Sequence, residues 1–179
     1  MGKEENNSRR NFLKTAASGA VVAAVAPSAF AKDPVKKPTV IPSAAKGAND
    51  RLRVAVLGVN GRGKTHIEVI MGLAQKANVE LVCLCDPDMN VLETRAADFE
   101  KKYGRKIQVQ QDFRKVYEDK TIDAITLATP NHWHALQTVL ACQAGKDVYV
   151  EKPATHNISE GRKIIEAAYK YNRIVQHGV

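Results

Sequence analysis

The sequence is poor in the residues that mark several classes of protein. Among 179 residues there are three cysteines and one tryptophan, and aromatic residues make up 6% of the chain. The cysteines form no Cys-x-x-Cys pair and no zinc-ligand spacing, and their odd number argues against a disulfide framework. His132 and His134 are too close together to form a metal-binding pair on one helix face. We therefore expect neither a disulfide scaffold nor a metal site.

A segregated basic surface and a long apolar run are also lacking. The formal net charge is +8, but the Lys and Arg residues are scattered and form no stripe with interleaved aromatic residues. We therefore expect no nucleic-acid partner. Ser18, Gly19 and Pro27 interrupt the Ala-rich stretch from Thr15 to Phe30, which makes it a poor membrane-spanning helix. No stable membrane insertion is expected.

The N-terminus has the order of an export signal. Residues 8–14 read Ser-Arg-Arg-Asn-Phe-Leu-Lys, and the Ala-rich stretch and a small-x-small site, Ala29-Phe30-Ala31, follow. This order resembles a twin-arginine signal, whereas a chance Arg-Arg pair before an Ala-rich tail is the alternative. We predict a signal peptide over 1–31, a periplasmic or other extracytoplasmic location, and a flexible linker over the proline-rich residues 32–50. The folded domain is then 51–179.

From Arg51 onward, apolar runs rich in Val, Ile and Leu alternate with stretches of helical period. The predicted strands are Leu52–Leu57, Val79–Cys85, Ile107–Gln110, Asp123–Ala128, Asp147–Val150 and Arg173–Gln176. The predicted apolar helix faces are Ile67/Ile70/Met71/Ala74, Leu92/Ala96/Phe99, Trp133/Leu136/Leu140 and Ile165/Ala168/Tyr169. Gly104 and Gly145 are expected to cap helix ends, and Asn157 with Glu160 resembles a capping box. This alternation predicts an α/β Rossmann fold, a doubly wound parallel sheet of about six strands with helices on both faces.

A glycine-rich turn follows the first predicted strand. Gly58, Asn60, Gly61, Arg62 and Gly63 stand between that strand and an amphipathic helix. Glycines there allow a tight turn and a close approach of the backbone to phosphate, and the helix N-terminus offers free N–H groups. The turn departs from Gly-x-Gly-x-x-Gly because Asn60 holds the middle position. We predict that these five residues bind the pyrophosphate of a dinucleotide.

Asp86 ends the second predicted strand, where a carboxylate can accept hydrogen bonds from an adenosine ribose and repel a 2′-phosphate. Pro87 follows, so no adjacent arginine neutralises such a phosphate. NAD is therefore favoured over NADP as the cofactor. The alternative is that Asp86 or Asp88 caps the next helix.

Two further motifs follow the fourth and fifth predicted strands. These are Thr129-Pro130-Asn131-His132-Trp133-His134 and Glu151-Lys152-Pro153. With the glycine-rich turn, in this order and spacing, they resemble the N-terminal domain of the Gfo/Idh/MocA (glucose-fructose oxidoreductase-like) family. The resemblance implies that Thr129, Pro130, Asn131 and His134 line the nicotinamide side of the cofactor. It also implies that Glu151 and Lys152 lie near the nicotinamide ribose, with Lys152 as the catalytic residue that assists proton transfer or orients a hydroxyl. Trp133 is expected in the core rather than in a substrate pocket.

The resemblance also implies a second α+β domain, which this chain lacks after its sixth predicted strand. We therefore interpret the chain as the nucleotide-binding half of an oxidoreductase, inactive alone, whose full-length parent forms a homo-oligomer. The parent is expected to transfer hydride between NAD and a sugar or polyol. An NAD-dependent glycoside hydrolase and a non-catalytic dinucleotide-binding module stay open as alternatives.

Overall fold

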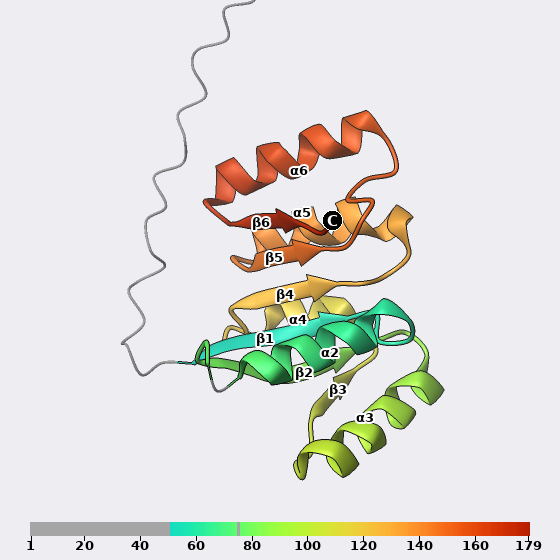
Figure 1. Ribbon diagram of the computed structural model, residues 1–179. Helices are drawn as coiled ribbons and strands as arrows, with labels where there is room; N and C mark the ends of the chain where they lie inside the picture. The colour runs from blue at the N-terminus through green and yellow to red at the C-terminus, as the bar shows by residue number, and fades with distance from the viewer. Residues whose placement is uncertain (1–50, 75) are drawn as a thin grey trace, which may run out of the picture. The chain divides into compact units, whose positions relative to one another are not determined.

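The computed structural model describes residues 51–74 and 76–179. The predicted signal peptide and linker lie outside the described residues. Six parallel strands form one sheet in the order β3-β2-β1-β4-β5-β6 (Figure 1). The strands are β1 (Leu52–Leu57), β2 (Val79–Cys85), β3 (Gln108–Gln110), β4 (Ala124–Leu127), β5 (Asp147–Val150) and β6 (Val175–His177). The helices are α2 (Arg62–Leu73), α3 (Met89–Tyr103), α4 (Phe113–Glu118), α5 (Asn131–Gln143) and α6 (Ile158–Tyr171). The predicted doubly wound Rossmann sheet is confirmed.

Two apolar clusters show how the helices cover the sheet. Alternate residues of β1 point to opposite faces, so that Val54 and Val56 pack with α2 and α3, whereas Ala55 and Leu57 pack with α4, α5 and α6. All four are buried, as expected for a parallel sheet with both faces covered. The strand order reverses between β1 and β4, and a ligand-binding crevice is expected at the carboxyl ends of these strands.

Local capping signals confirm several helix ends. Gly104 and Gly145 both have positive φ, at 70° and 78°. Gly104 directly follows α3, and Gly145 follows the C-cap residue Ala144 of α5. The side chain of Asn157 accepts a hydrogen bond from Glu160 N, and Glu160 Oε2 accepts one from His156 N. The predicted cap at the start of α6 is present in a variant form, because Glu160 bonds to the N–H of His156 rather than to that of the N-cap residue Asn157.

Predictions of helix faces were less accurate for α5 and α6. Trp133 and Leu136 were placed on the buried face of α5, but they are 40% and 48% exposed. Apart from His134 and Gln137, the buried residues of α5 are small, namely Ala135, Thr138, Ala141 and Cys142. Small side chains let α5 approach the sheet and α6, so the large apolar residues lie outward. The predicted core position of Trp133 is therefore wrong, and its ring contacts Phe113 edge-on.

The buried stripe of α6 is likewise shifted by one position from the prediction. Ile164 and Ala167 are buried, whereas Ile165 and Tyr169 are exposed. Helix α4 was not predicted, because its six residues are too short to show a helical period. Strands β3 and β4 are also shorter than predicted, and β6 begins and ends later.

The three cysteines lie in the apolar core. Cys83 and Cys85 of β2 share the face that packs on α4 and α5, and Cys142 of α5 belongs to the same cluster. All three are free thiols, as the sequence predicted for buried core residues. Among the described residues, no helix is both long enough and apolar enough to cross a bilayer.

Candidate functional site

The turn between β1 and α2 is built around glycines with different surroundings. Gly58 has a φ of 80°, and a Cβ added there would lie 2.7 Å from the backbone of Ala128 and Thr129 at the end of β4. A Cβ on Gly63 would lie 1.8 Å from the carbonyl oxygen of Gly58. At Gly61 an added Cβ would meet nothing within 4 Å. Gly58 and Gly63 are therefore required by the fold, whereas the space beside Gly61 is open.

The start of α2 leaves hydrogen-bond donors available for such a ligand. Its N-cap, Gly61, provides no side-chain hydrogen bond, and neither does Pro130 at the start of α5. The other three helices are capped by the side chains of Asp88, Asp112 and Asn157. Lys64 N bonds to the carbonyl oxygen of Gly61 and Trp133 N to that of Pro130. The N–H groups that precede them have no acceptor within their helix, so the two helices that begin at the switch point can bind anions.

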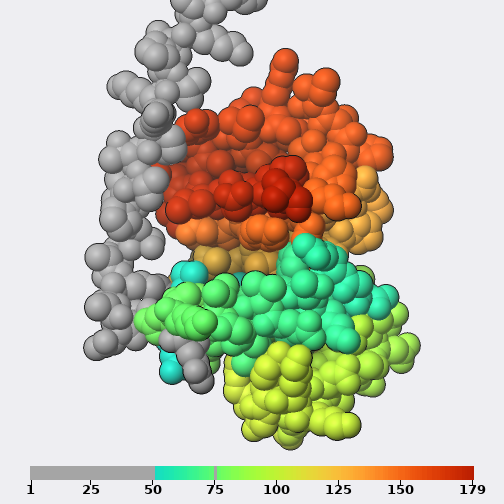
Figure 2. Space-filling model, viewed as in Figure 1, coloured from blue at the N-terminus to red at the C-terminus, as the bar shows by residue number. Residues whose placement is uncertain are grey.

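A cleft of about 440 Å³ lies at this edge of the sheet. The cleft is lined by the start of α2, by the segments that follow β4 and β5, and by the last residue. The lining residues are Arg62, Ala128, Thr129, Asn131, His134, Glu151, Lys152 and Val179. In Figure 2 the start of α2 (teal) lies against the orange segment that follows β5. The cleft thus brings together six predicted site residues. Gly58, Asn60 and Gly61 belong to the adjoining turn, Gly63 is the second residue of α2, and Pro130 precedes α5.

Glu151 is the most heavily bonded carboxylate in the cleft. Its Oε1 accepts hydrogen bonds from Arg62 Nε at 2.7 Å and from His66 Nε2 at 2.9 Å. Its Oε2 accepts one from the backbone N–H of Lys152 at 3.2 Å. Burial opposes ionisation, but the bonds from His66, Arg62 and Lys152 N outweigh it and lower the pKa of Glu151 to about 2. Glu151 is therefore a charged anchor that joins α2 to the segment carrying Lys152.

His66 takes part in this network but was not predicted from the sequence. It follows Arg62 by one helical turn, which places both side chains on the same face of α2. The ring is buried and packs edge-on against Tyr149. That spacing after the glycine-rich turn was the signal that could have identified it.

His134 joins the two segments that follow β4 and β5. Its Nε2 lies 2.7 Å from the Thr129 carbonyl oxygen and its Nδ1 lies 2.7 Å from the Pro153 carbonyl oxygen. Carbonyl oxygens only accept hydrogen bonds, so the ring makes both bonds only when both nitrogens carry a proton. Its side chain is buried and lines the cleft, and its two hydrogen bonds connect the segments that follow β4 and β5.

Asp86 lies at the other side of the glycine-rich turn. Its Oδ2 accepts from Val59 N at 2.9 Å and its Oδ1 from Asp88 N at 3.1 Å. Helix α3 is capped by Asp88, which accepts from Asn90 N. The capping alternative therefore holds for Asp88 and not for Asp86. Each Asp86 oxygen keeps a lone pair, which is compatible with an additional bond to a ribose hydroxyl.

Comparisons with known proteins agree with this architecture. Residues 52–179 match the model of an oxidoreductase family with an NAD-binding Rossmann fold, Gfo/Idh/MocA, and residues 6–26 match a twin-arginine translocation signal. A glycosyl hydrolase family 109 protein of Shewanella baltica is 33% identical over 175 residues, which are 91% of this chain and 37% of that protein.

Two solved structures show the same fold. Myo-inositol 2-dehydrogenase from Lactobacillus plantarum has a TM-score of 0.62 at 26% identity, over 72% of this chain and 36% of that chain. GenD2 from gentamicin A biosynthesis, solved with NAD, has a TM-score of 0.62 at 28% identity, over 72% of this chain and 34% of that chain. The chain thus spans little more than a third of each of these proteins. It carries a twin-arginine export signal and belongs to the Gfo/Idh/MocA oxidoreductase family, whose NAD-binding Rossmann domain its residues 52–179 match.

Proposed function

We propose that this chain is the cofactor-binding part of a longer, exported NAD-dependent oxidoreductase that transfers hydride between the cofactor and a sugar or polyol. The observation that carries the proposal is the cleft at the switch point. There an uncapped helix and an open glycine-rich turn meet the segment that holds Lys152. The family, the dehydrogenase among the solved neighbours and the short span relative to longer relatives support it.

The residues present fit a dinucleotide. The space at Gly61 and the N–H groups at the start of α2 that precede Lys64 suit a pyrophosphate, and Asp86 suits the adenosine ribose. Thr129, Pro130, Asn131, Glu151 and Lys152 are then left for the nicotinamide end. When bound, NAD supplies a nicotinamide ring that accepts or returns a hydride.

The protein's own part in the chemistry is to place a proton-transfer group. Glu151 holds the backbone N–H of Lys152, and Arg62 and His66 hold Glu151 from α2. This network fixes the backbone from which the exposed Lys152 side chain extends at the cleft. From there its ammonium form donates a hydrogen bond that orients the reacting hydroxyl, or its neutral amine takes up the proton of that hydroxyl.

Lys152→Ala tests this role in the full-length protein. We expect turnover to fall by about 100-fold or more, the usual scale for a proton-transfer group, while NAD affinity falls far less. Steady-state kinetics with a panel of sugars and polyols, followed through NADH absorbance, measures the first quantity, and calorimetry measures the second. Lys163→Ala on the exposed face of α6 is the matched control and should have no effect. Turnover within twofold of the parent would remove Lys152 from the chemistry.

A second candidate is an NAD-dependent glycoside hydrolase, favoured by the relative that bears a glycosyl hydrolase family 109 name. Hydride would then be removed and returned within one turnover. Release of a glycoside's leaving group without net NADH would identify this activity, whereas NADH that accumulates with a free sugar identifies the oxidoreductase.

The same site predicts a preference for NAD over NADP. The Asp86 carboxylate would repel a 2′-phosphate. Arg95, the nearby cation, already uses three of its donor groups on Val59 O, Asn60 O and Asp98. We expect NAD to bind the 179-residue chain about tenfold to a hundredfold more tightly than NADP in titration calorimetry. Asp86→Asn, whose amide oxygen can still accept from Val59 N, should reduce this preference, and Asp88→Asn should keep it. Equal affinities for both cofactors in the unaltered chain would refute the assignment.

A further inference from the structure

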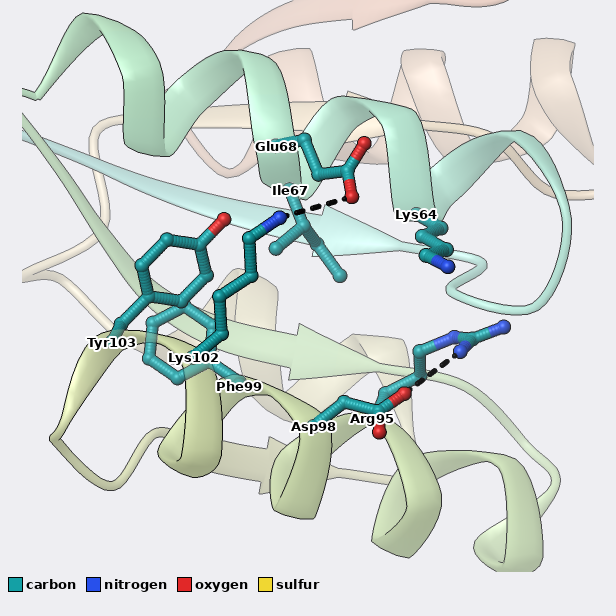
Figure 3. A pocket seen from close by; sticks show the side chains of 8 residues that line it. All are labelled: Lys64, Ile67, Glu68, Arg95, Asp98, Phe99, Lys102 and Tyr103. Atoms are coloured by element: carbon teal, nitrogen blue, oxygen red, sulfur yellow. Dashed lines mark hydrogen bonds and ion pairs between the residues drawn. The ribbon is translucent and has the colours of Figure 1, made fainter.

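Arg95 of α3 reaches across to the glycine-rich turn. Its Nε donates to the carbonyl oxygen of Val59 at 2.9 Å, and its Nη2 donates to that of Asn60 at 3.0 Å. Figure 3 shows the side chain extending from α3 toward the loop before α2, with Asp98 beside it. The Arg95 side chain is only 20% exposed. Two neighbouring carbonyl groups of the turn are therefore held by one rigid guanidinium.

These two bonds fix the orientation of two peptide planes. In a planar trans peptide the N–H points opposite to the C=O of the same unit, and neither bond involved is cis. Because Val59 O and Asn60 O point toward Arg95, the N–H groups of Asn60 and Gly61 point away from it. Two consecutive donors thus face the outside of the turn, where the space at Gly61 is open.

The turn is held from a second direction by Asp86, which accepts from Val59 N at 2.9 Å. Residue 59 is consequently anchored through its N–H by a carboxylate at the end of β2 and through its C=O by a guanidinium from α3. Without Arg95, Asp86 would still hold Val59 N, but the two peptide planes on either side of Asn60 would lose the hydrogen bonds to their carbonyl oxygens.

We propose that Arg95 is a positioning residue for the cofactor diphosphate: it turns the amides of Asn60 and Gly61 toward the phosphates without touching them. The proposal rests on dinucleotide binding at this turn. Arg95 acts through the backbone, because its engaged donors and its burial leave it little capacity to bind a phosphate directly. Its partner Asp98 is largely exposed on α3 and bonds to Arg95 Nη1, which is not one of the nitrogens that hold the turn.

The test compares Arg95→Met, Arg95→Lys and Asp98→Asn in the 179-residue chain. Met keeps the apolar stem but removes both carbonyl bonds, so NAD affinity should fall by about tenfold to a hundredfold. A lysine can reach one of the two carbonyl oxygens, so Arg95→Lys should lose an intermediate amount of NAD affinity. Asp98→Asn leaves the turn bonds intact and should bind NAD within twofold of the parent.

A readout at the amides themselves separates positioning from general stability. Inorganic pyrophosphate added to the ¹⁵N-labelled parent should shift the amide signals of Asn60 and Gly61, and the same addition to folded Arg95→Met should not. NAD affinity of Arg95→Met within twofold of the parent overturns the inference, as does an unchanged amide response. If Arg95→Met does not fold, the NAD affinity and the amide response of Arg95→Lys test the inference in its place. A parent chain that binds no NAD would instead refute the cofactor site.

Discussion

Gly63→Ala is expected to lower the free energy of unfolding by about 3 kcal/mol or more, the upper end of overpacking effects. Alanine is the better helix former by about 1 kcal/mol, so propensity alone would predict stabilisation. The new Cβ, however, would lie 1.8 Å from the Gly58 carbonyl oxygen and 2.8 Å from its carbon, and both are backbone atoms that cannot rotate away. The turn must therefore move, and NAD binding should be lost with it. Urea unfolding and calorimetry measure the two effects.

Two matched variants make this result interpretable. Gly72→Ala is the same change on the same helix with no atom within 4 Å, and it should leave stability unchanged or raise it. Gly61→Ala also meets no protein atom, so the domain should stay stable while the methyl group obstructs the ligand and weakens NAD binding. A stable Gly63→Ala domain with parental NAD affinity would contradict the observed close approach of α2 to Gly58.

Glu151→Gln is expected to cost about 2 kcal/mol of stability near pH 7, the scale for losing hydrogen bonds to a charged group, because the Arg62 left behind is largely exposed. The carboxylate is 5% exposed, and Arg62 and His66 both bond to its Oε1. Glutamine keeps the shape but removes the charge that these donors stabilise. Urea unfolding at fixed ionic strength measures the difference between the two chains.

The pH dependence of that difference gives a sharper check. The folded state lowers the pKa of Glu151 from an ordinary value of 4.5 to about 2, so its carboxylate stabilises the fold above pH 4.5. As pH falls from 4.5 toward 2, the parent should lose this stabilisation, while the Gln variant has no such group to titrate. The difference should therefore shrink across that range. Glu166→Gln, an exposed partner of Lys163, should change stability by less than about 1 kcal/mol at any pH. A difference that stays constant with pH would show that the Glu151 charge is not what stabilises the cleft.

The sequence predicted those features of the site that depend on chain order alone. Strands of a parallel sheet end at one edge, so motifs that directly follow strands had to meet there. This reasoning placed the glycine-rich turn, Thr129 and Lys152 around one cleft, and the structure shows them there. The local caps at Gly104 and Asn157 were predictable for the same reason, because each depends on a few consecutive residues.

Features that depend on how elements pack were not predictable in this way. Arg95 contacts Val59 from 36 residues away, and only the packing of α3 beside α2 brings them together. The buried face of α5 was misassigned because small residues pack against the sheet while Trp133 and Leu136 lie outward. The apolar period of the sequence pointed to the largest side chains of α5, whereas close packing against the sheet favours small ones.

The three core thiols have a consequence for a protein that carries an export signal. Burial raises the pKa of Cys83 to about 12 and that of Cys142 to about 11, and it raises the pKa of Cys85 as well. The thiolate is the form that attacks disulfides and oxidants, so these three thiols are unreactive in the folded domain. Outside the cytoplasm, where thiols are readily oxidised, folding itself protects them. Oxidative damage to this domain is therefore coupled to unfolding. A molecule that unfolds exposes three thiols at once, and their oxidation would prevent it from refolding.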